Sequence, residues 1–182
     1  LLSPESLSRS LVRLFGRFGC MLCVFGSLPL TPAQTTLYWD RNGTTAGAGV
    51  SPTGNWNTTG AANWNTSSAG TSAVANWTSG SHAVFSAGTD ATGTYTVTLG
   101  AAMNVGNLTF QEGATTVTGS TLNFTLAGGS TIDVASGLTS TVNSILGGSV
   151  ALTKTGTGTF ITGGASGNTH SGAVNINAGV FE

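Results

Sequence analysis

Charged side chains are scarce in this chain of 182 residues, which holds only 5 Lys or Arg and 6 Asp or Glu. They fill 6% of the positions, whereas soluble domains usually carry about 25%. A formal net charge of −1 lacks the clustered basic groups of a phosphate-binding surface, so we expect no nucleic-acid partner. The apolar content of 39% also excludes a highly charged, disordered tail.

Cysteine and histidine are equally scarce, with 2 of each. Cys20 and Cys23 have the spacing of a thioredoxin-type pair, but they lie in an apolar stretch without the βαβ unit that such a pair requires. His82 and His170 stand alone, without a neighbouring pair of carboxylates. The sequence therefore predicts no metal site, no cofactor and no Ser-His-Asp triad.

Residues 1–33 differ in composition from the rest of the chain. Three arginines between positions 9 and 17 precede a mostly apolar run at 18–30, and Thr31-Pro32-Ala33 offers small residues to a signal peptidase. A membrane-spanning helix is the weaker alternative, because Gly, Ser and Pro interrupt the apolar run. We interpret 1–33 as a signal peptide. The mature protein is then expected to be exported.

Short alternating runs fill the chain beyond residue 82, and glycines separate them. Apolar and β-branched residues alternate there with small polar ones, which is the period of strands with one buried face. No window shows the apolar spacing of an amphipathic helix. The clearest runs are 95–99, 107–110, 122–126 and 132–134. The mature chain is predicted to be all-β.

Two all-β architectures fit this pattern, a sandwich or barrel built from hairpins and a solenoid of stacked coils. Hairpins favour Asn-Gly or Asp-Gly turns, and the only such dipeptide, Asn42-Gly43, precedes the strand-rich part. Strand clusters recur at about twenty-residue intervals, the length of one coil of a repeat protein. They are centred near Phe110, Val134, Leu152 and Ile176. The turns and this interval therefore favour the solenoid, with its coils in residues 83–182.

The segment 34–82 is rich in Trp, Asn and Gly and is predicted to be an irregular N-terminal cap. A solenoid's first coil exposes its core, and large rings cover it efficiently. The alternative is a carbohydrate platform, because exposed indole faces stack on sugar rings while Asn side chains bond sugar hydroxyls. Both hypotheses concern Trp39, Trp56, Trp64 and Trp77.

A catalytic site would require paired carboxylates or an acid beside a base, and the sequence offers isolated groups. Asp90, Glu112, Asp133 and Lys154 lie about one coil length apart, which could stack them. Their phases disagree, because Asp133 lies between inward Ile132 and Val134, whereas Lys154 has the parity of inward residues. A solvent-facing or turn position for each is the expectation, and we predict no catalytic residues.

The segment 147–182 resembles one copy of the autotransporter-associated β-strand repeat, whose pattern runs L-x-K-x-G-x-G-x-L-x-L, N-T-Y-x-G and T-x-I-x-x-G-x-L. Thr162 and His170 depart from the pattern, which has an apolar residue and Tyr there. The Trp-rich segment is similar to the leader ahead of such repeats. The matching residues are Leu152, Lys154, Gly156, Gly158, Phe160, Asn168, Thr169, Gly172, Ile176, Gly179 and Phe181.

This resemblance implies a right-handed parallel β-helix. It also implies a non-enzymatic passenger with a structural or adhesive role, extracellular or displayed at the cell surface in association with the outer membrane. Its partners would be cell-surface glycans or host and neighbour surfaces. The resemblance also implies a translocator barrel in a longer chain, and no run of amphipathic strands suited to one ends this sequence. The alternative is a carbohydrate-binding or polysaccharide-cleaving β-helix at the cell surface. A bare Thr and Asn outer face favours the stalk, and two close carboxylates favour the enzyme.

Residues of the last repeat should alternate between the core and the solvent. Ile176 is expected to point inward, so that Ile176→Ala costs about 2–5 kcal/mol of unfolding free energy. Asn175, one step away, should face outward, and its replacement by Ala should change the stability by less than about 0.5 kcal/mol.

Export is the first testable prediction. When the chain is expressed in a bacterium with its native start, cleavage after Ala33 should release a protein that begins at Gln34, with cleavage after Gln34 as the alternative. N-terminal sequencing of the extracytoplasmic product checks this. A secreted product that still contains Cys20 would contradict the assignment.

Overall fold

The computed structural model describes residues 34–163 and 167–182, and these contain strands and turns but no helix. The predicted signal peptide, 1–33, lies outside the described residues. Glycines at positive φ, such as Gly113 at 64° and Gly137 at 78°, form the turns between strands, because side chains disfavour this conformation. The prediction of an all-β chain is confirmed.

The strands form three sheets, which we name A, B and C. In spatial order, sheet A holds β15 (Val174–Ile176), β13 (Leu152–Thr155), β10 (Ser130–Val134), β7 (Leu108–Phe110), β4 (His82–Phe85), β1 (Thr36–Trp39) and β3 (Trp64–Asn65). Sheet B holds β16 (Val180–Phe181), β14 (Thr159–Thr162), β11 (Thr139–Val142), β8 (Ala114–Gly119), β5 (Thr94–Leu99) and β2 (Gly54–Trp56). Sheet C holds β12 (Ile145–Gly148), β9 (Thr121–Phe124) and β6 (Met103–Val105).

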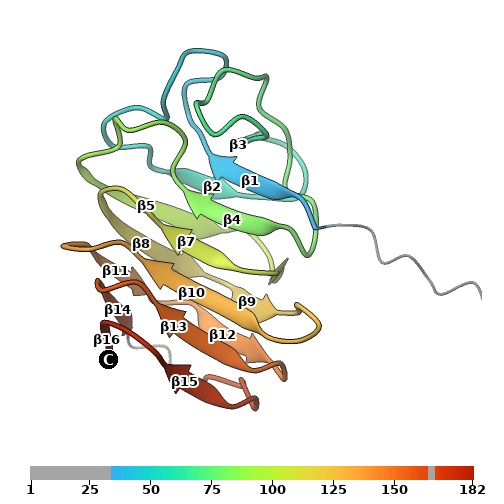
Figure 1. Ribbon diagram of the computed structural model, residues 1–182. Helices are drawn as coiled ribbons and strands as arrows, with labels where there is room; N and C mark the ends of the chain where they lie inside the picture. Colours follow the sequence, from blue (N-terminus) through green and yellow to red (C-terminus); the bar gives the residue numbers. More distant parts are fainter. Residues whose placement is uncertain (1–33, 164–166) are drawn as a thin grey trace, which may run out of the picture. The chain divides into compact units, whose positions relative to one another are not determined.

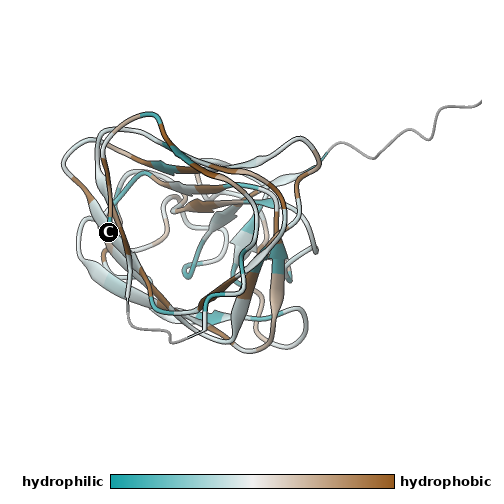
Figure 2. Ribbon diagram, turned by 90° about the horizontal axis from the view of Figure 1, so that it is seen from below, coloured by the Kyte–Doolittle hydropathy of each residue, from teal (hydrophilic) through white to brown (hydrophobic). Residues whose placement is uncertain are grey.

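Each central coil contributes one strand to each sheet, so the chain visits A, B and C in turn before it starts the next coil (Figure 1). The strands of successive coils pair in parallel, for example β5 with β8 and β7 with β10. Viewed along the stack, the coils superimpose on one closed outline (Figure 2). The structure is thus a parallel β-solenoid, as predicted. The strand clusters expected near Phe110, Val134, Leu152 and Ile176 all lie in sheet A.

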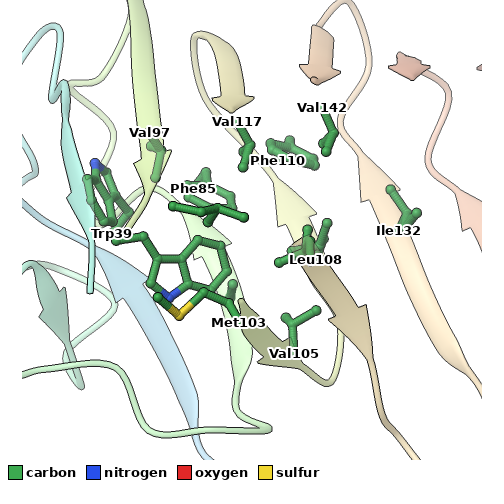
Figure 3. Close-up of a cluster of buried hydrophobic side chains, with 14 of the residues drawn as sticks. Trp39, Phe85, Val97, Met103, Val105, Leu108, Phe110, Val117, Ile132 and Val142 are labelled. Carbon is green, nitrogen blue, oxygen red and sulfur yellow. The ribbon is translucent and has the colours of Figure 1, made fainter. Parts of the chain in front are cut away.

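The core is a set of inward side chains stacked from coil to coil (Figure 3). Phe85 and Phe110 are register partners on β4 and β7, and their rings stack 5.1 Å apart at 12°. The ring of Phe160, on the opposite sheet B, lies 6.2 Å from that of Phe110. All three are fully buried. The alternation in the sequence therefore places one apolar side chain per two residues in a continuous interior.

The N-terminal segment contributes the first strands of two sheets. β1 pairs in parallel with β4, and β2 pairs in parallel with β5. β3 instead pairs antiparallel with β1, and its other side makes only an isolated antiparallel bridge between Trp64 and Ala75. The segment predicted as an irregular cap therefore shares the solenoid's hydrogen bonding and ends sheet A with a reversed strand.

The C-terminal coil leaves its inward residues exposed, which corrects the expectation for Ile176. Ile176 is in register with buried Lys154 and so has inward parity, but 56% of it is accessible. Val174, in register with buried Leu152, is 48% accessible. Within residues 34–163 and 167–182, no coil covers this end. Because the side chain is only half removed from water, Ile176→Ala should cost far less than a full cavity would.

The stacked rings provide a test of the core. Phe110→Ala should lower the free energy of unfolding by about 3–5 kcal/mol, because it removes a fully buried ring between two others. Thr109→Ala, on the outer face of the same strand, should stay within about 0.5 kcal/mol. Chemical denaturation of both variants measures the difference, and equal losses would contradict the inward assignment of β7.

Candidate functional site

The four tryptophans form one buried cluster in the N-terminal segment. Their exposed fractions are between 0 and 4%. The ring centroids of Trp56 and Trp77 lie 4.7 Å apart, and those of Trp39 and Trp64 lie 5.2 Å apart, both edge to face. The indole N–H of Trp39 donates to the carbonyl of Pro52 (2.6 Å). No indole face is free for a sugar ring, so the hypothesis of an exposed carbohydrate platform is wrong because these rings fill the core.

The asparagines beside the tryptophans hold the loops of this segment together. The amide of Asn65 donates to the carboxylate of fully buried Asp40 (2.8 Å) and to the carbonyl of Ser72 (2.6 Å). The amide of Asn63 donates to the carbonyl of Asn55 (2.8 Å). These side chains are engaged within the protein, and their role in the structure is to satisfy buried backbone groups.

The acidic residues of the coils bind backbone amides of neighbouring coils. Asp90 accepts hydrogen bonds from the N–H groups of Ala48 (2.8 Å) and Gly49 (3.0 Å). Glu112 accepts one from the N–H of Ala91 (2.9 Å). Burial raises the pKa of Glu112, the nearby charge of Asp90 raises it further, and the bond from Ala91 opposes both. Both carboxylates thus link one coil to another.

Asp133 and Lys154 occupy opposite faces of sheet A. Asp133 is partly exposed on the outer face and accepts a hydrogen bond from the hydroxyl of Thr155 (2.8 Å). Lys154 is only 1% exposed and lies in the inward row between Ile132 and Ile176. The expectation of a solvent-facing or turn position is therefore wrong for Lys154, whose aliphatic stem continues the apolar row.

The ammonium group of Lys154 bonds backbone carbonyls at a corner of the solenoid. It donates to the carbonyls of Thr155, Gly156 (2.8 Å) and, in the next coil, Ala178 (3.4 Å). Burial lowers the pKa of Lys154, and the charge of Asp133 opposes that shift. The lysine of the repeat motif thus joins two successive corners.

The glycines of the motif allow these corners to approach closely. Gly179 has a φ of 70°, and a side chain there would run into the carbonyls of Gly156 and Gly158. A side chain at Gly172 would meet the carbonyl of Val150. Gly179 therefore requires both the conformational freedom and the small size of glycine, and Gly172 requires the small size.

Two further motif residues, Asn168 and Thr169, attach the last coil to the strand β12 of sheet C. The side-chain oxygen of Asn168 accepts the N–H of Leu146 (2.9 Å). The N–H of Thr169 donates to the carbonyl of the same Leu146 (2.9 Å). Both residues therefore continue the hydrogen bonding of sheet C into the last coil.

His170 stands where the motif has Tyr, and it is packed against the coils. Its ring lies edge-on to Phe124, with the ring centroids 6.5 Å apart. Its Nε2 lies 2.9 Å from the carbonyl of Val150, within hydrogen-bond distance. The departure from the motif is thus accommodated by a packed, hydrogen-bonded side chain.

Titratable groups that could hold a metal ion are dispersed. Across residues 34–163 and 167–182, no three His, Cys, Asp or Glu side chains gather at one point. The Nδ1 of His82 accepts the N–H of Asn107 (3.0 Å), and burial lowers the pKa of His82.

The described part of the chain has no helix long and apolar enough to cross a bilayer.

An open groove follows the corner between sheets A and B. It has a volume of about 530 Å³ and combines the carboxylate of Glu112 with the hydroxyls of Thr92 and Thr139 and the apolar side chains of Ala114 and Leu138. A second cavity, of about 200 Å³, lies at the exposed C-terminal coil and is lined in part by Leu152, His170 and Phe181. The groove thus combines a carboxylate, two hydroxyls and apolar side chains on neighbouring coils.

Threonine is the commonest residue on the outer face of sheet B. The inward residues of β5, β8 and β11 are buried, so the residues between them face the solvent. The threonines on this face are Thr94, Thr96, Thr98, Thr116, Thr118, Thr139, Thr141 and Thr159. These residues were not singled out from the sequence, although the repeated Thr-x-Thr pattern indicates them.

The stacked coils and the hydrogen-bonded motif residues define a parallel β-solenoid. Among curated proteins, the chain is similar to the adhesin BmaC autotransporter of Brucella suis biovar 1 (strain 1330), with 38% identity over 151 residues. The match covers 83% of this chain and 4% of the length of that adhesin. The chain is therefore an autotransporter passenger-like protein, homologous to a short part of an autotransporter adhesin.

Two other comparisons give no match. No protein-family model matches the chain, and no solved structure matches it. The assignment of one repeat to 147–182 therefore rests on its residues and on their places in the fold.

The buried lysine generates a prediction about pH. Because burial lowers the pKa of Lys154, the unfolded chain binds more protons than the folded one between the lowered value and the ordinary 10.5. Stability from this residue should therefore rise with pH across that window. In Lys154→Met this rise should be missing, and at neutral pH the carbonyls left without a donor should cost about 1–3 kcal/mol.

Chemical denaturation of the wild type and of Lys154→Met, from pH 7 to the ordinary lysine pKa of 10.5, measures the difference in unfolding free energy between them at each pH. Burial raises the pKa of Tyr95, which lowers stability at high pH, but this contribution is common to both proteins and cancels. Thr153→Met, on the outer face of the same strand, is the control. A parallel pH dependence of wild type and Lys154→Met would contradict the buried position of the ammonium group.

Proposed function

We propose that the chain is a non-enzymatic, exported passenger segment that is displayed at the cell surface and mediates adhesion. The homology to part of an autotransporter adhesin supports this proposal. The solenoid supports it as well, because stacked coils give a long, stiff body whose outer faces are free to vary. The observation that carries the proposal is the outward placement of uncharged Thr and Asn side chains over an apolar interior.

The positions of the acidic residues favour the non-enzymatic role. A glycosidase requires two carboxylates flanking the scissile bond, with one free to act as an acid. Here Asp90 and Glu112 each accept backbone hydrogen bonds from another coil. Asp133 is bonded to Thr155 on the outer face of sheet A. Each carboxylate thus has a structural partner.

Carbohydrate binding is the second candidate, and the groove at the corner of sheets A and B favours it. One oxygen of Glu112 bonds Ala91, and the carboxylate lines the groove beside Thr92 and Thr139. Carboxylates and hydroxyls bond sugar hydroxyls, while Ala114 and Leu138 supply apolar contact for a sugar ring. Neighbouring-cell glycans are the partners that this groove would fit.

Surface display tests the adhesive role. A non-adherent bacterium that displays this chain should be retained on glycan-coated or abiotic surfaces in greater numbers than the same strain without it. The control is the display of the destabilised Phe110→Ala variant at equal surface density. Equal retention of all three strains would contradict adhesion.

The same strains separate the two candidates. If the groove binds glycans, Glu112→Gln should weaken retention on glycan coats and free sugar should compete. If adhesion uses the uncharged faces, neither Glu112→Gln nor free sugar should change retention. Release of reducing ends from pectin, alginate or xylan by the purified chain would contradict the non-enzymatic assignment.

A further inference from the structure

We propose that the outer face of sheet B is an ice-binding surface. The threonines on this face, which we call the threonine face, form a two-dimensional array whose spacing follows from the solenoid. The inference does not depend on the adhesive role proposed above, because it rests on the register of the strands alone.

The register of sheet B aligns the threonines in rows that run from coil to coil. Thr96 pairs with Thr116, and Thr116 pairs with Thr141. Thr98 pairs with Thr118 in the next row, and Thr139 pairs with Thr159 in the row on the other side. Ala114, Asn143, Ile161 and Gly163 fill the remaining places. No charged residue interrupts the array between β5 and β14.

The threonine hydroxyls of the array are free to bond water. Among the residues that the structure describes, no threonine of this face has a hydroxyl that is hydrogen-bonded within the protein. The threonine hydroxyls that are bonded lie elsewhere, at Thr53, Thr71, Thr125, Thr155 and Thr162. Each threonine of the face also presents a methyl group, and β-branching restricts its side chain to few rotamers. The face therefore holds hydroxyl and methyl groups in a fixed, repeating order.

The spacing of this order is set by the backbone. Neighbouring strands lie about 4.8 Å apart, and alternate residues along one strand lie about 6.6 Å apart. Hexagonal ice has one oxygen repeat close to the spacing between strands and another somewhat longer than the spacing along a strand. Water held by the hydroxyls can thus occupy ice-like positions at little entropic cost, because the protein has already fixed the acceptors and donors.

The other two faces lack such an array. On sheet A, the outer row that includes Thr131 and Thr153 also contains His82, Asn107 and Asn175. On sheet C, the outer row runs from Asn104 through Asn123 to Gly147. The same solenoid therefore carries one face suited to an ordered water lattice and two that serve as internal controls.

The test measures binding to ice directly. The purified chain should be incorporated into a slowly growing ice hemisphere and should slow the recrystallisation of fine ice. Thr116→Lys should abolish most of both effects, because a long charged side chain at the centre of the array prevents flat contact. Thr153→Lys, in the outer face of sheet A, should leave both unchanged.

Thermal unfolding of the two variants checks that each is folded. Exclusion of the wild-type chain from ice would overturn the proposal, and so would equal effects of the two substitutions. Binding to crystalline cellulose without binding to ice would also overturn it and assign the face to a flat polysaccharide. A chain that mediates cell adhesion but does not bind ice would contradict the ice-binding proposal alone. A chain that binds ice but does not mediate adhesion would contradict the adhesive role alone.

Discussion

The in-register parallel pairing of successive coils is the constraint on which the rest of the structure depends. It satisfies the backbone amides and carbonyls of each strand by its neighbours above and below. It also places like positions over one another, so that Phe85 lies on Phe110 inside and Thr96 lies on Thr116 outside. An apolar interior and a polar exterior then follow from alternation alone, without charge.

The same constraint makes the two ends of the stack different from its middle. At the N-terminal end, antiparallel β3 and the buried tryptophans cover the first coil. At the C-terminal end, the inward residues of β15 are exposed, as the 56% accessibility of Ile176 shows. Burial in a solenoid thus depends on the neighbouring coil as much as on the residue itself.

Much of the fold could be predicted because alternation and coil length are local features. The strand clusters near Phe110 and Val134 marked sheet A, and the rarity of hairpin turns favoured stacked coils. The burial of Lys154 could not be predicted in this way, although its parity was visible. Its charge argued for solvent, and only the folded corners bring the carbonyls of Gly156 and Ala178 to its ammonium group. The alignment of the outward threonines into rows likewise could not be predicted. It depends on the register between coils, and the turns between strands differ in length.

In this weakly charged solenoid, the residues that stabilise the interior differ from those that are available for recognition at the surface. The inward positions accept apolar residues, and a lysine only where carbonyls at a corner accept its hydrogen bonds. The carboxylates are drawn into links between coils, as Asp90 and Glu112 show. Few side chains at the outward positions of the strands are needed to hold the coils together. Their chemistry can therefore differ from sheet to sheet while the coils remain the same. Recognition by this protein is therefore best sought in the rows of its outer faces and in the groove beside Glu112 rather than in a cluster of catalytic groups.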